Sequence, residues 1–151
     1  MIGRRMRALL LRGRTSAAMT ADDLPGFHKK SFSLAFGGGE IWCAHIDGLY
    51  GFTEPAAEKF SAEIKAVLRP SATSLVIVVM NETIPAQPLL ERIAKTFAEN
   101  PRFVKRAAFV GLDAGARARL KHLLRKHGAL CACAYFSDLE KAKHWIAGEE
   151  Y

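Results

Sequence analysis

Residues 74–80 read Ser74-Leu75-Val76-Ile77-Val78-Val79-Met80, of which six are apolar and four are β-branched. Neighbouring side chains on a β-strand point to opposite faces of the sheet, so an apolar run without alternation requires both faces to be buried. That requirement is typical of a central strand in a parallel sheet with helices on both sides. The run therefore predicts an α/β fold.

Helical patterns lie on both sides of this run. Before it, apolar residues recur at helical spacing between a predicted N-cap at Thr53 and a stop at Pro70. These residues are Ala57, Phe60, Ile64, Val67 and Leu68. After it, a loop at 81–85 precedes a second apolar stripe, which Asn100-Pro101 ends. That stripe consists of Leu89, Leu90, Ile93 and Phe97.

The beginning of the pattern predicts a hairpin. Apolar residues alternate with small or polar ones at 32–36, and a second strand is predicted at 41–46. Gly37-Gly38-Gly39 between them can adopt the positive φ that a tight turn needs. The two strands are therefore expected to pair antiparallel.

The last third predicts two more strands, at 103–110 and 130–136, each followed by a helix. The first helix should begin at the N-cap Asp113 and end at Gly128, and the second should follow a capping box formed by Ser137 and Glu140. The element order is then ββαβαβαβα. We expect a mixed, mostly parallel five-stranded sheet with helices on its faces, because β-α-β crossovers join parallel strands.

The length and the net charge of the chain limit its number of domains and the class of partner that we expect. The chain has 151 residues, enough for one domain, and a net charge of +7. Arg4, Arg5, Arg7, Arg12 and Arg14 carry most of that charge. We therefore expect a flexible basic N-terminal segment at 1–26, or translation from Met19, and one nearly neutral domain at 27–151. A basic arm that touches RNA or anionic lipid is the alternative, and nucleic acid is otherwise not an expected partner.

Cysteine usage and hydropathy point to the cytoplasm. No apolar run approaches the roughly 18 residues of a membrane span. The three cysteines, an odd number, favour a reducing compartment over a disulfide framework. Cys131 and Cys133 should share one face of a strand as small core residues, because a metal site would need two more ligands.

The search for catalytic motifs yields little. The sequence has no phosphate-binding loop after a strand and no nucleophile elbow, so no cofactor and no catalytic residue is predicted. His45 and Asp47 lie two residues apart near Tyr50, and we interpret His45 as a structural histidine. An enzyme that uses His45 or the strand-end loops remains the least favoured hypothesis.

The loops after the parallel strands are the predicted binding region. Ligands of open α/β sheets gather outside the carboxyl ends of the strands, where helix N-termini favour anions. Predicted ligand- or partner-binding residues are Asn81, Glu82, Thr83, Gly111 and Asp113. Thr83 is expected to be a helix cap, with phosphorylation of its hydroxyl as the alternative. Arg117, Lys121 and Arg125 predict a basic surface that would suit an acidic partner.

Three segments resemble the SpoIIAA-like branch of the STAS family (sulfate transporter and anti-sigma-factor antagonist domains). They are the hairpin leading into Ile46-Asp47-Gly48-Leu49, the segment Arg106-Ala107-Ala108-Phe109-Val110-Gly111, and the closing residues 135–146 from Tyr135 to Ile146. The resemblance spans residues 31–148. It implies a regulatory or protein-binding domain without its own catalysis. Some such domains are switched by phosphorylation in an Asp-Ser context after the central strand, and here that position reads Asn81-Glu82-Thr83-Ile84-Pro85.

The preferred hypothesis is therefore a non-enzymatic regulatory module that binds another protein. The fold expectation also resembles CRAL-TRIO lipid carriers, so a carrier of a small apolar or lipid-like ligand is the alternative. An exposed edge strand could additionally support a homodimer.

Overall fold

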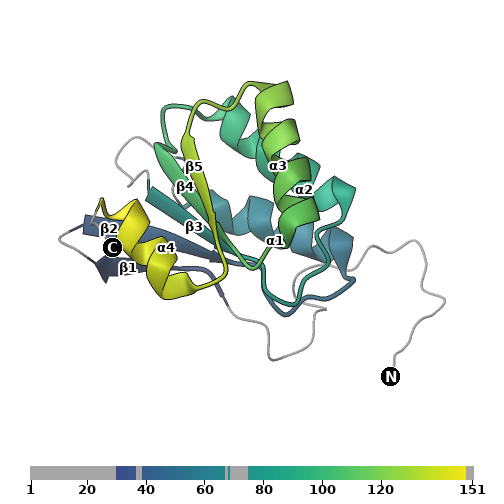
Figure 1. Ribbon diagram of the computed structural model, residues 1–151, viewed down its shortest axis with the longest axis horizontal. Helices are drawn as coiled ribbons and strands as arrows, with labels where there is room; N and C mark the ends of the chain where they lie inside the picture. Colours follow the sequence, from purple (N-terminus) through teal and green to yellow (C-terminus); the bar gives the residue numbers. More distant parts are fainter. Residues whose placement is uncertain (1–29, 37–38, 67, 69–74, 149–151) are drawn as a thin grey trace.

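The central strand β3 (Leu75–Val79) lies in the middle of a five-stranded mixed sheet (Figure 1). The structure is a computed structural model that describes residues 30–36, 39–66, 68 and 75–148. The elements are β1 (Phe32–Phe36), β2 (Gly39–His45), α1 (Thr53–Ile64), β3, α2 (Gln87–Glu99), β4 (Arg106–Val110), α3 (Ala114–His127), β5 (Ala132–Phe136) and α4 (Leu139–Ile146). The predicted α/β class is confirmed.

The strands lie in the sheet in the same order as in the chain, β1-β2-β3-β4-β5. β1 and β2 pair antiparallel, with Phe32 opposite Cys43, which confirms the predicted hairpin. The other three pairs are parallel. The carboxyl ends of β2, β3, β4 and β5 consequently meet at one edge of the sheet.

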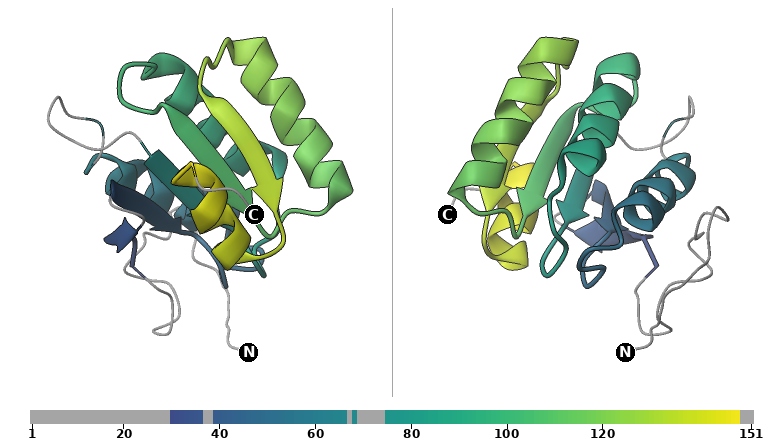
Figure 2. Two further views of the ribbon diagram at one scale, coloured as in Figure 1. Left: turned by 60° about the vertical axis from the view of Figure 1, so that its left-hand side comes forward. Right: turned by 90° about the vertical axis from the view of Figure 1, so that its right-hand side faces the viewer.

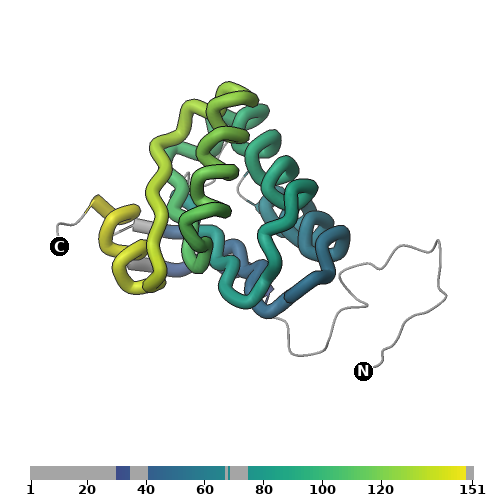
Figure 3. Tube along the Cα trace, turned by 45° about the vertical axis from the view of Figure 1, so that its right-hand side comes forward, coloured from purple at the N-terminus to yellow at the C-terminus, as the bar shows by residue number. Residues whose placement is uncertain are grey.

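The helices are divided unequally between the two faces. Each crossover advances the sheet by one strand in the same direction, and crossovers of one hand then place their helices on one side. Figure 2 shows α1, α2 and α3 side by side on that face, and Figure 3 shows α4 apart from them. No strand follows α4 among the described residues, and it packs on the opposite face against β3, β4 and β5.

The larger core lies between the sheet and α1–α3. Val76, Val78 and Phe109 contribute the sheet side of this cluster. The ring of Phe97 in α2 lies 6.0 Å from the rings of both Phe60 and Phe109, so one aromatic group joins two helices to the sheet. Full burial of each such side chain stabilises the fold by about 1.5–3 kcal/mol.

The smaller core lies under α4. Ile77 and Val79 of β3 pack there with Ala142 and Ile146. Because Val76 and Val78 face the larger core, β3 is buried on both faces as its sequence predicts. The guanidinium carbon of Arg106 also lies 4.6 Å from the centre of the Trp145 ring, which helps to hold the end of α4 on the sheet.

Helix ends agree with the sequence in α3 and differ in α1 and α4. The Asp113 side chain accepts a 2.8 Å hydrogen bond from the Ala116 amide, and Gly128 ends α3 at a φ of 80°, as predicted. Thr53 is not a cap, because it is already the first helical residue and Phe52 precedes it. The predicted capping box at Ser137 is also wrong, because α4 begins one residue later and Asp138 caps it.

Three strands are shorter than predicted. β3 ends at Val79 rather than at Met80, β4 begins at Arg106 rather than at residue 103, and β5 begins at Ala132 rather than at residue 130. Leu130, which precedes β5, is 81% exposed. The expectations for the segment 1–26, for Gly37 and Gly38, and for Val67 and Pro70 fall outside the described residues. In the part of the chain that is described, no helix has the length and apolar content to cross a membrane.

Candidate functional site

Two loops at the carboxyl edge of the sheet are joined by backbone hydrogen bonds. The loop after β2 and the loop after β3 run together as an extension of the parallel pair. The Gly48 amide donates to Asn81 at 2.7 Å, the Tyr50 amide donates to Glu82 at 2.8 Å, and the Ile84 amide donates back to Tyr50 at 2.7 Å. Residues 48–50 and 81–84 therefore form one hydrogen-bonded unit beyond the strand ends, which we call the ledge.

The hydroxyl group of Thr83 connects this ledge to the chain that leaves β2. It accepts a 3.0 Å hydrogen bond from the Leu49 amide and donates one to the carbonyl of Ile46. The residue is only 7% exposed. Thr83 is therefore not the predicted helix cap, since Ala86 occupies that position in α2. Phosphorylation would require the ledge to open, because the hydroxyl is already engaged on both sides and shielded from a kinase.

Two ledge residues adopt left-handed backbone conformations. Tyr50 has a φ of 45° and Glu82 a φ of 60°, and neither is a glycine. Each such conformation costs on the order of 1–3 kcal/mol and persists only where the surroundings enforce it. The hydrogen bond between these two residues supplies part of that enforcement. Strain of this kind concentrates at functional sites, which makes the ledge a candidate binding site.

Gly111 brings the loop after β4 against the same ledge. It has a φ of 96°, and a Cβ atom built on it would lie 2.7 Å from the Asn81 nitrogen. Only glycine tolerates both the positive φ and this close approach. The Gly111 amide also donates to Phe136 at 3.0 Å, which links this loop to the end of β5.

These loops surround a surface hollow of about 320 Å³, which we call the edge hollow. It is lined by Tyr50, Glu82, Thr83, Ile84, Pro85, Gly111 and Asp113. Four of the five predicted binding residues line it, and the fifth, Asn81, lies directly against Gly111. The structure thus brings together residues that are up to 63 positions apart in the chain, from Tyr50 to Asp113.

The sequence did not identify Tyr50, Ile84 and Pro85 as binding residues. Tyr50 and Ile84 are 50% and 57% exposed, which is unusual for residues of this size and hydrophobicity. Ile84 and Pro85 belong to the predicted loop, but hydropathy alone suggests burial for Ile84. Tyr50 could have been found from the parallel pairing of β2 with β3, because that pairing places the end of β2 at the same edge.

The edge hollow combines apolar contact surface with two carboxylates, Glu82 and Asp113. One Asp113 oxygen accepts from the Ala116 amide at the start of α3. The acidic lining does not suit the anion that helix N-termini alone would favour, since a carboxylate repels a second negative charge. A ligand that offers an apolar group beside a positive charge fits this lining.

Neither a metal cluster nor a known relative assigns chemistry to this edge. Among the described residues, no group of three or more His, Cys, Asp or Glu side chains could hold a metal ion. Comparison of the chain with protein-family models, with curated proteins and with solved structures produced no match.

His45 belongs to the framework of the fold. Its Nδ1 lies 2.9 Å from the Asp47 carboxylate, and its ring stacks on Phe32 with centroids 5.3 Å apart. The residue is buried, and its backbone amide donates to the Ser31 hydroxyl at 2.9 Å. These contacts support the structural interpretation of His45, because a catalytic base must reach a substrate atom.

The residues of the predicted basic surface, Arg117, Lys121 and Arg125, recur every four positions along α3. Nε of Arg117 donates to the Leu112 carbonyl at 3.0 Å, so this side chain stabilises the start of α3. Lys121 and Arg125 instead line a separate hollow beside β5. Arg117 nevertheless acts electrostatically on Tyr135, which lines the same hollow, so all three cations lie near β5.

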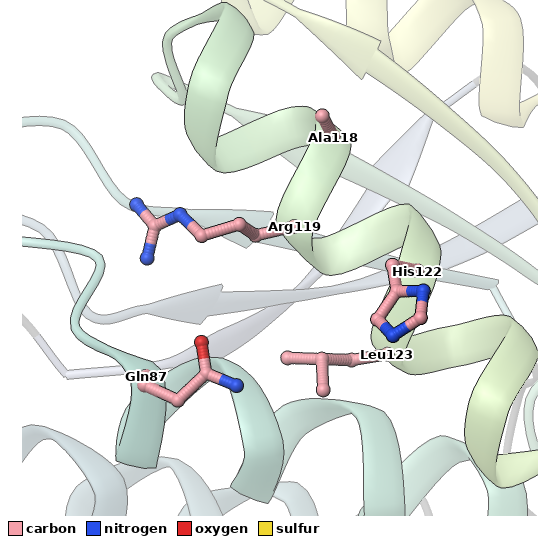
Figure 4. Close-up of a pocket in the computed structure, with 5 residues that line it drawn as sticks. All are labelled: Gln87, Ala118, Arg119, His122 and Leu123. Carbon is pink, nitrogen blue, oxygen red and sulfur yellow. The ribbon is translucent and has the colours of Figure 1, made fainter.

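A third hollow of about 230 Å³ lies between α2 and α3 (Figure 4). Gln87 of α2 faces Arg119, His122 and Leu123 of α3 across it. Arg119 donates a 3.1 Å hydrogen bond to the Pro85 carbonyl, so it supports the loop that carries the edge hollow. Arg119 thus links the lining of this hollow to the loop that lines the edge hollow.

Proposed function

We propose that this chain is a non-enzymatic protein-binding module and that the edge hollow receives a segment of its partner. The observation that carries the proposal is the exposure of Tyr50 and Ile84 on the hydrogen-bonded ledge. Large exposed apolar side chains next to polar groups are typical of protein interaction sites.

The rigidity of the ledge favours binding. Its hydrogen bonds hold Tyr50, Glu82 and Ile84 before a partner arrives, so little conformational entropy remains to be lost on association. Tyrosine also contributes a large contact area with few rotatable bonds. Both features support a preformed docking surface.

The charges around the edge hollow indicate the chemistry of the partner. Glu82 and Asp113 flank the apolar contacts of Tyr50, Ile84 and Pro85. A partner segment with an apolar side chain next to a lysine or arginine would match both features. The basic residues Lys121 and Arg125 line a different hollow and are not part of this surface.

The alternatives receive less support. Ligand pockets for drug-sized molecules typically span roughly 300–1,000 Å³ and enclose most of the ligand. The edge hollow, with about 320 Å³, stands at the lower end of that range and lies at the surface, so it suits a side chain better than a lipid. The STAS-like segments at 46–49, 106–111 and 135–146 also favour a binding domain over a carrier.

The proposal is tested by selecting peptides from a random library on the immobilised full-length protein. The Ile84→Ser variant should reduce the affinity of the selected peptides by about tenfold or more, which corresponds to about 1.4 kcal/mol. The matched control is Leu130→Ser, which changes an even more exposed apolar residue at the opposite end of the sheet and should leave affinity unchanged. Both variants should unfold at the temperature of the parent protein.

The selected peptides should carry lysine or arginine beside an apolar residue, and added salt should reduce their affinity for the protein. Peptides that bind Ile84→Ser and the parent protein equally well would refute the docking surface. Enrichment of acidic peptides that depend on Lys121 and Arg125 would assign the interaction to another face.

A further inference from the structure

Cys131 and Cys133 form a thiol pair in a hollow that the proposed function does not use. Their Sγ atoms are 3.5 Å apart, and both side chains are half-buried on the face of β5 that α3 covers. The hollow measures about 260 Å³, and Lys121, Arg125 and Tyr135 line it together with both cysteines. Cys43, in contrast, is buried in the core on the opposite face of the sheet.

The geometry permits a bond between the two sulfur atoms. Residues two apart on an extended strand have Cα atoms about 6.6 Å apart, close to the upper limit of about 6.8 Å for a disulfide. Cys131 precedes the first residue of β5, so its backbone is outside the strand ladder and can adjust. Disulfides near this limit are strained, and strained or exposed disulfides are the easily reduced ones.

The two thiols are not equivalent. The hydrogen bond from Cys133 lowers the pKa of Cys131, whereas the same contact and burial raise the pKa of Cys133 well above its usual range. The Cys133 Sγ also lies 3.6 Å from the Cys131 carbonyl oxygen, so its single S–H proton is shared between that oxygen and the Cys131 sulfur. Cys131 is therefore the first to lose its proton and the better nucleophile of the pair.

The walls of the hollow select the reaction partner. Lys121 and Arg125 extend from α3 beside the thiols, and the Lys121 ammonium lies 5.3 Å from the centre of the Tyr135 ring. Two cationic side chains attract an anionic molecule. We propose that Cys131 and Cys133 form a reversible dithiol–disulfide pair that exchanges with anionic low-molecular-weight disulfides such as oxidised glutathione.

The exchange proceeds in two steps. The Cys131 thiolate attacks one sulfur of the small disulfide, and its S–S bond breaks to release one small thiolate and leave a mixed disulfide on Cys131. The Cys133 thiol then loses its proton to solvent and attacks the Cys131 sulfur, which releases the second small thiolate. The protein loses two electrons and two protons in total, and the small disulfide is reduced to two thiols.

The experiment uses the full chain in buffers of graded glutathione redox ratio, followed by acid quenching, alkylation and peptide mass spectrometry. Cys131 and Cys133 should become protected together as an internal disulfide, and a reductant should reverse the change. Cys43 should remain a free thiol in the folded protein. Persistence of both thiols under fully oxidising conditions would overturn the proposal.

Single variants test whether each thiol releases the small molecule bound to the other. Cys133→Ser should retain a glutathione adduct on Cys131, and Cys131→Ser should retain one on Cys133, because neither variant keeps the second thiol that resolves the mixed disulfide. In the parent protein, early acid quenching should trap the mixed disulfide on Cys131, and trapping it on Cys133 instead would contradict the assignment of Cys131 as the attacking thiol. Thermal unfolding of both variants serves as the control for folding.

The effect of the charges in the hollow is tested by comparing oxidised glutathione with a neutral small-molecule disulfide. The double variant Lys121→Gln/Arg125→Gln should react several-fold more slowly with oxidised glutathione but at an unchanged rate with the neutral 2-hydroxyethyl disulfide. If both reagents slow equally, or neither does, the selection of anionic partners is wrong.

Discussion

Gly111 illustrates how a single residue determines the shape of the candidate site. At a φ of 96°, it lets the loop after β4 approach Asn81 to a distance that no Cβ atom allows. This contact sets one wall of the edge hollow against the other. A change at this residue should therefore disturb both stability and the hollow.

We expect Gly111→Ala to reduce the free energy of unfolding by about 2 kcal/mol or more, because of the positive φ and the clash with Asn81. Denaturant unfolding followed by circular dichroism measures this loss. The matched control is Gly115→Ala within α3, where a Cβ atom would make only an ordinary 3.7 Å contact with Asp113.

Gly115→Ala should stabilise the protein by about 0.5–1 kcal/mol, because alanine favours a helix more than glycine does. If the two variants proved equally stable, the close approach of Gly111 to Asn81 would not exist in solution.

At the scale of the elements, the cap at the start of α4 is important because it stabilises the helix that covers the second face of the sheet. Among the described helices, α4 alone covers the second face of the sheet, and it has only eight residues. The Asp138 carboxylate accepts a 2.8 Å hydrogen bond from the Glu140 amide, whereas Ser137 is exposed outside the helix. The cap therefore lies at Asp138.

We expect Asp138→Ala to cost about 1 kcal/mol of stability and to increase amide hydrogen exchange in α4. Ser137→Ala should change stability by less than about 0.5 kcal/mol, since it removes no cap. Hydrogen exchange combined with thermal unfolding distinguishes the two positions. A larger effect of Ser137→Ala would restore the capping box that its sequence suggests.

At the scale of the whole molecule, a buried polar network connects α1 with the hairpin. Lys59 is only 1% exposed, and its ammonium donates to the His45 carbonyl and to Glu63, the latter at 2.7 Å. Glu63 also accepts from the Ser31 hydroxyl, which in turn accepts from the His45 amide. One lysine thus joins the end of β2, the helix α1 and the segment before β1.

We expect Lys59→Met to lower the unfolding free energy by about 2–3 kcal/mol, because it leaves Glu63 without its cation and the His45 carbonyl without its donor. The double variant Lys59→Met/Glu63→Gln should lose less than the sum of the two single variants, since it leaves no unpaired charge. A double-mutant cycle by denaturant unfolding measures this coupling. Strict additivity would mean that the pair is not coupled in the fold.

Much of the fold could be predicted because its signals are local. The apolar run at 75–79 indicated a strand buried on both faces, and Asp113 and Gly128 marked the ends of α3. The errors at Thr53 and Ser137 have a common cause. A capping residue is recognisable by type, but its position depends on where the first helical turn closes, and packing shifts that by a residue.

The sequence predicted which loops form the candidate site, but it did not predict which of their side chains are exposed. The rule that ligands gather at the carboxyl ends of parallel strands led to Asn81, Glu82, Gly111 and Asp113. It could not show that Thr83 is enclosed, because the Leu49 amide and Ile46 carbonyl that engage it come from another loop. It also could not show that Ile84 is exposed.

The sequence by itself determined the type of each element, the hairpin and the central place of β3, since side-chain periodicity and turn chemistry act over a few neighbouring residues. Only the tertiary structure decided that three helices share one face, that Tyr50 meets Glu82, and that Cys131 and Cys133 face the cations of α3. Those outcomes depend on the order of strands in the sheet. That order is set by contacts between distant residues, which no local pattern encodes.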